Sequence, residues 1–268
     1  MTSNADLFRQ LHSGPDLLML PNCWDAGSAR LLESLGARAV ATTSAGLDWS
    51  RGYPDGNHLP VAELVAAIRA IARVIDVPLT VDMEAGYSNE PGEVGDTVAA
   101  VVDAGAVGIN LEDGTAPAEL LARKIAAARR AAEVAGVALF INARTDVYLK
   151  DLAPEDRRLE ETLARATMYR DAGADGLFVP KLTLESAVRE VAARAKMPLN
   201  VLLWPGLARP ARLRELGVRR LSSGAAIAQA AWTRARTFAT AFLAGEEDPR
   251  AEAAVPTSEI NALLAQRM

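Results

Sequence analysis

A short motif recurs along this chain and restricts the folds open to it. In each copy an amphipathic segment ends at a glycine, and an apolar run begins within a few residues. Four copies are regular, at 35–40, 104–109, 172–177 and 216–221, and a looser fifth lies at 135–139. Because glycine readily adopts the left-handed conformation that ends a helix, each copy predicts a helix followed by a strand.

Strands that alternate with helices build parallel sheets through right-handed crossovers. The strands are expected at 17–20, 39–44, 79–84, 108–112, 139–145, 176–180, 199–204 and 219–223, and the helices at 25–35, 60–75, 92–104, 118–135, 155–172, 183–195, 208–216 and 224–244. Eight units in 268 residues predict an α/β protein, a (β/α)8 TIM-type barrel. A doubly wound open sheet is the alternative, because periodicity alone does not show that the ring closes.

The chain shows no interdomain linker and no low-complexity tract. We therefore expect one catalytic barrel domain over 1–245 and a C-terminal extension over 246–268 that ends in a short helix. The segment 245–257, with Gly245, Pro249 and Pro256, is expected to connect the two.

Composition excludes several classes of partner. The net charge of −5 and the pI near 5.3 argue against nucleic acid or an anionic membrane. No apolar run reaches the length of about 18 residues that a transmembrane helix needs, and no signal-peptide pattern opens the chain. A single cysteine, Cys23, cannot form an internal disulfide, which favours a reducing cytoplasm.

Three acidic residues close two neighbouring strands of the predicted barrel. Asp82 and Glu84 end one strand, and Glu112 ends the next. In a strand, residues two apart share a face, so Asp82 and Glu84 are expected to point the same way. Carboxylates gathered at the mouth of a barrel suit a hard divalent cation, Mg²⁺ or alternatively Mn²⁺. The competing interpretation is that each acid only caps the following helix.

Other polar residues are expected at the same end of the barrel. Trp24 follows the first strand, the turn Ser44-Ala45-Gly46 follows the second, and Asn142 and Arg144 lie in the fifth. A buried arginine is costly unless it is paired, so Arg144 either pairs with one of the acids or binds a substrate carboxylate. The Ser44 turn offers backbone N–H groups to an anion, although such turns are common.

The two histidines carry weaker signals. His12 falls in a predicted N-terminal helix and is expected to be exposed to solvent. His58 lies in the glycine- and proline-rich loop 51–58, where a surface position is the simpler interpretation and an acid–base role in a lid the alternative.

These residues, in order and spacing, resemble the isocitrate lyase/phosphoenolpyruvate mutase superfamily over about residues 5–245. The matching segments are 20–30, 42–47, 52–55, 81–87, 111–113 and 142–146. The resemblance implies a Mg²⁺-dependent enzyme that makes or breaks C–C or P–C bonds beside a 2-oxo acid or its enolate. It also implies a homo-oligomer, a dimer or tetramer in which the final barrel helix, here within 225–244, is exchanged between neighbours.

The resemblance also implies roles for individual residues. Asp82 would be the metal ligand, and Asp55, Glu84 and Glu112 would arrange metal-bound waters. Ser44, Ala45 and Gly46 would hold the substrate carboxylate, with Trp24 and Asn142 beside it. Arg144 would bind a substrate oxygen and offset enolate charge.

The chain departs from the superfamily pattern in two places. Lyases of this superfamily carry a Lys-Lys-Cys-Gly-His type loop after the fourth strand, but here 114–120 is Gly-Thr-Ala-Pro-Ala-Glu-Leu. Cleavage of isocitrate or methylisocitrate by the route that uses that loop is therefore not expected. The pair Asp82-x-Glu84 also replaces the commoner Asp-x-Asp.

The function predicted from the sequence is a Mg²⁺-dependent lyase or decarboxylase acting on a small 2-oxo acid, such as oxaloacetate, through an enolate. One alternative is a phosphonopyruvate hydrolase or phosphoenolpyruvate mutase-like enzyme that breaks a P–C bond. The other is a barrel that binds a 2-oxo acid with little or no catalysis. Tyr53, His58, Tyr87 and water are all candidate proton donors.

Overall fold

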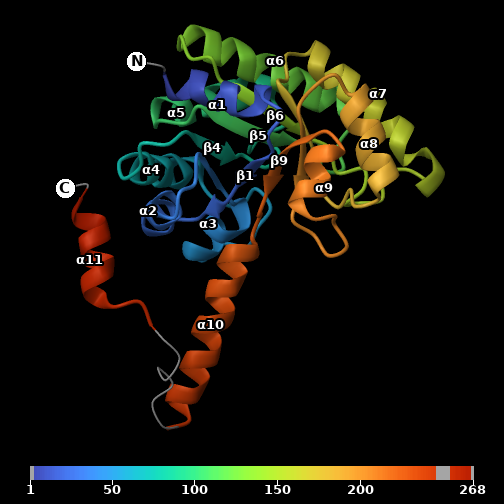
Figure 1. Ribbon diagram of the computed structural model, residues 1–268. Coiled ribbons are helices and arrows are strands. Elements are labelled where there is room, and N and C mark those ends of the chain that lie inside the picture. The colour runs from blue at the N-terminus through green and yellow to red at the C-terminus, as the bar shows by residue number, and fades with distance from the viewer. Residues whose placement is uncertain (1–2, 246–253, 267–268) are drawn as a thin grey trace.

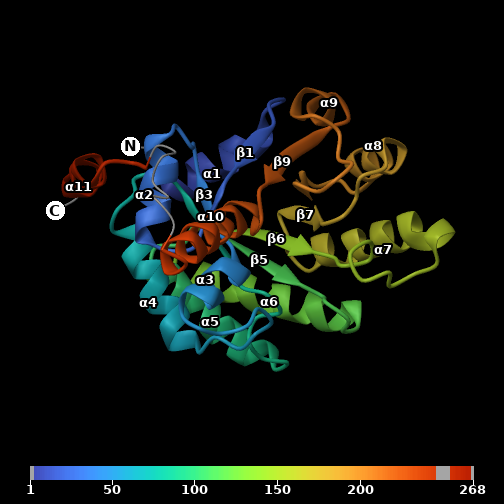
Figure 2. The same cartoon turned by 90° about the horizontal axis from the view of Figure 1, so that it is seen from below.

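The computed structural model describes residues 3–245 and 254–266, in which parallel strands form an inner layer and helices lie around them (Figures 1 and 2). The strand order is β1-β9-β8-β7-β6-β5-β4-β3-β2. The strands are β1 (Leu18–Leu20), β2 (Asn22–Cys23), β3 (Val40–Thr42), β4 (Leu79–Asp82), β5 (Gly108–Glu112), β6 (Phe140–Arg144), β7 (Gly176–Val179), β8 (Leu199–Leu202) and β9 (Val218–Ser222).

The first strand position of the barrel is divided in two. β1 pairs with β9 and β2 pairs with β3, and only Pro21, which has no backbone N–H to donate, separates them. β1 and β2 together therefore occupy one strand position of the barrel, and this position joins the two ends of the sheet. This closure confirms the (β/α)8 barrel and excludes the open doubly wound sheet.

The helices follow the strands as predicted, with one addition. They are α1 (Asn4–Ser13), α2 (Ala26–Ser34), α3 (Ser44–Ser50), α4 (Val61–Ala72), α5 (Pro91–Asp103), α6 (Ala118–Val134), α7 (Arg158–Asp171) preceded by the 3₁₀ turn η1 (Glu155–Arg157), α8 (Glu185–Arg194), α9 (Pro210–Glu215), α10 (Ala226–Leu243) and α11 (Thr257–Ala265). The added helix, α3, begins at the turn that the sequence assigned to anion binding.

α1 closes the amino-terminal end of the barrel. Phe8 and Leu11 pack with the first residues of β1 and β6 in a small apolar cluster. His12 lies in this cluster at 4% exposure, and its ring stacks on Phe140 with the centroids 4.2 Å apart. Burial lowers the pKa of His12 to about 3, so its ring is neutral. The prediction that His12 is exposed was wrong, because α1 covers the amino-terminal end of the barrel and buries His12 against the strands.

A layer of polar side chains fills the barrel between α1, at the amino-terminal end, and the mouth, at the carboxyl ends of the strands. The Asn142 amide donates to Asn110 Oδ1 at 2.9 Å, and Arg220 Nε donates to Ser222 Oγ at 3.2 Å. Arg220 is 1% exposed, and burial lowers its pKa to about 9 while the charge of Asp82 acts in the opposite direction. The barrel interior therefore carries positive charge below its acidic mouth.

α10 leaves the barrel at the end opposite α1 (Figure 1). Most of its residues are exposed, including Trp232 at 57% and Phe242 at 67%. α11 packs against α2, where Arg30 Nε donates to the carbonyl of Leu263 at 3.3 Å. Residues 246–253 of the predicted connection 245–257 lie outside the described residues, and the domain division between 1–245 and 246–268 stays a prediction.

No helix within residues 3–245 and 254–266 combines the length and apolar character that crossing a membrane requires.

Candidate active site

The Ser44 turn forms the first turn of α3 and contacts the end of β4. Ser44 Oγ donates to Asp82 Oδ2 at 3.0 Å, and the Ser44 backbone N–H lies 3.5 Å from the same oxygen. A Cβ added at Gly46 would lie 2.8 Å from Thr43 Cγ2 and 3.0 Å from Trp24 Cβ. Only glycine fits this position without a shift of its neighbours, and Trp24 is half-buried beside it.

Glu84 lies beyond the end of β4 and not within the strand. The strand ends at Asp82, and Glu84 adopts a left-handed backbone with φ 50°. The alternation that would place both acids on one face therefore does not extend to Glu84. A non-glycine residue in this conformation stores strain that functional sites commonly tolerate.

Several contacts hold the Glu84 turn in place. The Asn57 N–H donates to the Glu84 carboxylate, and Tyr87 Oη donates to Glu84 Oε1 at 3.4 Å. From α6, the buried Lys124 Nζ donates to the carbonyl of Ala85 at 2.7 Å. The loop 51–58 and Tyr87 thus orient the Glu84 carboxylate, while α6 holds the backbone of the turn at Ala85.

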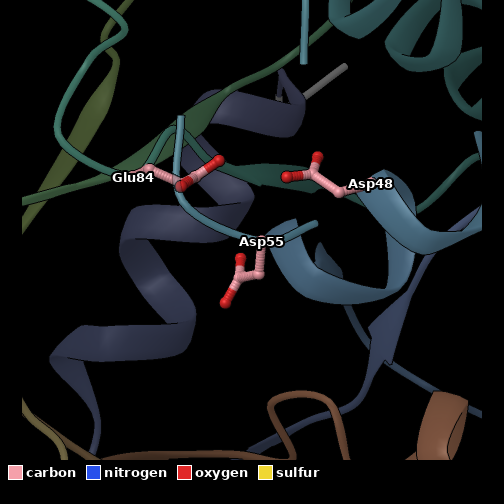
Figure 3. A group of neighbouring side chains, drawn as sticks. All are labelled: Asp48, Asp55 and Glu84. Carbon is pink, nitrogen blue, oxygen red and sulfur yellow. The ribbon is translucent and has the colours of Figure 1, made fainter. Parts of the chain in front are cut away.

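Three carboxylates meet at this turn. One oxygen from each of Asp48, Asp55 and Glu84 lies within 4.8 Å of the other two (Figure 3). Asp48 comes from the last turn of α3, and Asp55 from the loop that follows α3. Sequence reasoning missed Asp48, because it searched strand ends and Asp48 lies inside a helix. Its position between Leu47 and Trp49, as an acid flanked by large apolar residues, was the available signal.

The acids raise one another's pKa values. Burial, together with the charges of Asp82, Asp48 and Asp55, raises the pKa of Glu84 to about 8 against the opposing effect of the Asn57 N–H. Burial and the charges of Asp55 and Asp82 raise the pKa of Asp48 to about 6. Such crowding is unfavourable without a nearby positive charge.

Arg144 supplies positive charge at the edge of this cluster. Its Nη1 lies 2.6 Å from Glu112 Oε2, and its Nε donates to Asp146 Oδ1 at 2.7 Å. Burial lowers the pKa of Arg144, but the charges of Glu112, Asp146 and Asp82 outweigh it and raise the pKa overall. Burial raises the pKa of Glu112 to about 7, although Arg144 opposes the shift. The sequence left open whether Arg144 pairs with an acid, and the structure shows that it does.

Asp113 fixes the loops around Arg144. Its carboxylate accepts from the Asp146 N–H at 2.9 Å, from Tyr169 Oη at 2.6 Å and from Arg165 Nη1 at 2.8 Å. The end of β5, the loop after β6 and α7 are thereby tied together. This network holds Asp146 against the Arg144 guanidinium.

The donor set fits a hard divalent cation. Asp82 Oδ1 and both carboxylate oxygens of Asp48 are buried without a hydrogen-bond partner among the described residues. The candidate ligands are all carboxylate oxygens, which Mg²⁺ and Ca²⁺ prefer. Capping does not explain the acids, since the N-cap residues of α5 and α6 are Glu90 and Pro117.

Comparison with known proteins identifies the family. The family model for phosphoenolpyruvate phosphomutase matches residues 8–243 of this chain. The chain belongs to the phosphoenolpyruvate mutase family. This places it in the isocitrate lyase/phosphoenolpyruvate mutase superfamily, as the sequence motifs indicated.

Relatives of this phosphoenolpyruvate mutase family member span nearly its whole length. An uncharacterised protein of Mycobacterium tuberculosis is 38% identical and covers 96% of this chain and 95% of its own. A Burkholderia cenocepacia structure, provisionally assigned as a phosphonomutase, is 41% identical with a TM-score of 0.84 and covers 88% of this chain and 99% of its own. The 2-methylisocitrate lyase of Bacillus subtilis is 29% identical over 73% of this chain and 65% of its own length.

A more distant structure shares the fold alone. Phosphonopyruvate hydrolase, solved with oxalate and Mg²⁺, is 24% identical with a TM-score of 0.85 and covers 98% of this chain and 95% of its own.

In this phosphoenolpyruvate mutase family member, Asn142 lies deeper in the barrel than the mouth acids, whereas Tyr53 and His58 lie in the loop after α3. Asn142 lies on β6 two residues before Arg144, is 1% exposed and donates to Asn110 in the polar layer. Tyr53 Oη donates to Glu63 Oε1 at 3.1 Å, and His58 is exposed. Only residues 113–117 separate β5 from α6. The catalytic, substrate-binding and metal-binding roles assigned from the sequence remain predictions.

Proposed function

We propose that this family member is a Mg²⁺-dependent lyase or decarboxylase that acts on a small 2-oxo acid through an enolate. One observation carries the proposal: carboxylates with unpartnered buried oxygens lie at the barrel mouth, where the half-buried, permanently charged Arg144 pairs with Glu112. Superfamily members include lyases and mutases of 2-oxo acids, which supports the reaction class.

Four acids would hold the cation in this proposal. Asp82 would be the direct ligand, with Asp55, Glu84 and Glu112 ordering its bound waters; Mn²⁺ is the alternative cation. A bound divalent ion supplies Lewis-acid stabilisation of negative charge that develops on a substrate oxygen.

The protein's own groups would bind and orient the substrate. Ser44, Ala45 and Gly46 would hold the carboxylate, with Trp24 forming the wall that packs against Gly46. The Arg144 guanidinium would face the 2-oxo oxygen. When the bond between C3 and the distal carboxylate of an oxaloacetate-like substrate breaks, CO₂ departs and the bond's electron pair forms the C2=C3 double bond. The carbonyl π electrons move onto the 2-oxo oxygen, and Arg144 would offset the resulting enolate charge.

A proton must then reach the enolate carbon. The lyase loop residues are absent, and Tyr53, His58, Tyr87 and water were the candidates from sequence. Among the three side chains, Tyr87 has its hydroxyl on the Glu84 carboxylate, whereas Tyr53 is bonded to Glu63 and His58 is exposed. We therefore favour Tyr87, or a water that it holds, as the donor.

The test is release of pyruvate from oxaloacetate and related 2-oxo dicarboxylates, measured with Mg²⁺ and after its removal by a chelator. We expect turnover that depends on the cation. A protein that binds Mg²⁺ and turns over no 2-oxo acid would contradict the catalytic proposal.

Two rival functions give different outcomes in parallel assays. A phosphonate-cleaving enzyme, favoured by the fold shared with phosphonopyruvate hydrolase, would release phosphate from phosphonopyruvate. A binding protein, favoured by the short 113–117 loop, would gain thermal stability with 2-oxo acids but form no product.

We also propose that the active form is a dimer or tetramer built by exchange of α10. An apolar groove of about 690 Å³ lies between α2 and α9, where the eighth helix of a closed barrel would pack. Leu17, Met19, Leu35, Leu203 and Leu207 are among its lining residues. α10 extends away from the barrel (Figure 1), and none of its residues lines this groove. We therefore propose that α10 of a second copy covers the groove.

A further inference from the structure

Asp48 is not among the acids that the sequence assigned to the site. Its side chain is fully buried, and neither carboxylate oxygen has a hydrogen-bond partner among the described residues. None of the ion pairs within residues 3–245 and 254–266 involves it. A buried carboxylate is strongly unfavourable unless a proton or a cation neutralises it. The fold therefore maintains a costly group at this position.

The surroundings of Asp48 point to a cation. Its carboxylate is directed towards Glu84, with Asp55 close by on the following loop (Figure 3). Two oxygens bound directly to one Mg²⁺ are at most about 4.2 Å apart, twice the metal–oxygen distance, and waters bound to the ion extend this reach. The separations within this trio, each within 4.8 Å, suit an ion that some of these oxygens bind directly and others bind through its waters.

The nearest positive charge does not neutralise Asp48. Arg51, the C-cap residue of α3, lies near enough to lower the pKa of Asp48, but its Nη1 donates to Ser50 Oγ and not to Asp48. The other charged groups around Asp48, which are Asp55, Asp82 and Glu84, are all acids.

We propose that Asp48 is a further carboxylate of the cation site, which together with Asp55 and Glu84 forms a three-sided cradle for the ion or its bound waters. This inference rests on the proposed function, because the ion is the one that the activity would require. It adds a group from α3 to acids that otherwise come from strand ends and loops. Since α3 also begins with the Ser44 turn, the same helix would contact the cation at one end and the substrate at the other.

The test compares binding of Mn²⁺ and Mg²⁺ to the full chain by titration calorimetry and by the Mn²⁺ electron paramagnetic resonance signal. Asp48→Asn preserves shape and removes the charge. We expect the affinity for both cations to fall by about ten-fold or more. The metal-free variant should melt at the wild-type temperature or above it, because an uncompensated buried carboxylate is removed.

Asp156→Asn is the matched control. Asp156 is exposed on η1, and its change removes the same charge without touching the mouth. We expect wild-type affinity for both cations from this variant. Equal affinities of wild type and Asp48→Asn, within two-fold, would overturn the inference and leave the proposed function standing. A wild-type protein that binds neither cation would instead defeat the proposed function.

A crystal of the wild type grown with Mn²⁺ keeps the proposal testable if Asp48→Asn does not fold. We expect an anomalous peak between Asp48, Asp55 and Glu84. A peak farther than about 5 Å from both Asp48 oxygens, beyond the reach of a ligand or a shared water, would overturn the assignment.

Discussion

The Arg144 guanidinium lies between two carboxylates and cannot be replaced by a simple positive charge. It uses separate nitrogens for Glu112 and Asp146, a geometry that the planar fork provides and an ammonium group does not. We expect Arg144→Lys to lower kcat/KM with a 2-oxo acid by about 100-fold or more, while the protein stays folded. Steady-state kinetics and thermal melting measure the two effects.

Arg129→Lys is the control for this change. Arg129 contacts the Asp175 carboxylate and the carbonyls of Leu139 and Gly173, away from the mouth. Its substitution should lower the melting temperature and leave kcat unchanged. Equal losses of kcat from both variants would mean that Arg144 serves the fold and not the reaction.

The raised pKa values of the mouth acids predict how stability depends on pH. In the metal-free protein Glu84 has a pKa of about 8 and Glu112 of about 7, against ordinary values near 4.5. The folded state therefore holds more protons than the unfolded state between these limits, and these groups make stability fall as the pH rises from about 4.5 to 8. Glu84→Gln should make the metal-free melting temperature less dependent on pH across that range.

Bound Mg²⁺ should oppose this loss of stability at high pH, because Mg²⁺ binds the deprotonated carboxylates. The stabilisation given by a fixed Mg²⁺ concentration is expected to grow between pH 6 and pH 8, which thermal melting can follow. A stabilisation that stays constant over this range would contradict the assignment of these acids to a cation site.

At the scale of the element, α3 connects the mouth to α10. The close contacts of Gly46 with Thr43 and Trp24 extend to Ala228 of α10, whose Cβ lies 3.1 Å from the position of an added Cβ. Gly46→Ala should destabilise the protein by about 1–3 kcal/mol and weaken substrate binding. Gly92→Ala in α5, where an added Cβ has no neighbour within 4 Å, should be neutral or stabilising. Chemical denaturation of both variants measures the difference.

Elements also show where sequence reasoning succeeds. Repeated glycine stops and apolar runs predicted eight of the nine strands, and β5 (Gly108–Glu112) has the predicted bounds. β2 (Asn22–Cys23) was not predicted, because the first strand was expected to end at residue 20. The prediction that Asp82 and Glu84 share one face of a strand was wrong. The strand ends at Asp82, and the left-handed backbone at Glu84 sets the direction of the Glu84 side chain. α3 was missed since seven residues with an internal glycine carry little helical periodicity, and Asp48 was missed with it.

At the scale of the molecule, contacts between distant segments decide what sequence could not. His12 is buried only because α1 crosses the end of the ring, and Arg220 is buried only because β9 turns it inward beside Asn110. Neither placement follows from local pattern. The same holds for α10, whose apolar residues suit either a packed final helix or an exchanged one.

The proposed exchange of α10 is testable by the size of the assembly. A helix with Trp232 and Phe242 exposed, together with an apolar groove on the same chain, leaves both surfaces uncovered in a monomer. We expect light scattering to give a dimer or tetramer. Met19→Arg, which places a charge in the groove at a side chain 52% exposed, should shift the protein towards monomer. Val134→Arg, on α6 at 91% exposure, should leave the assembly intact. A wild-type monomer at assay concentrations, or equal effects from the two variants, would contradict helix exchange through this groove.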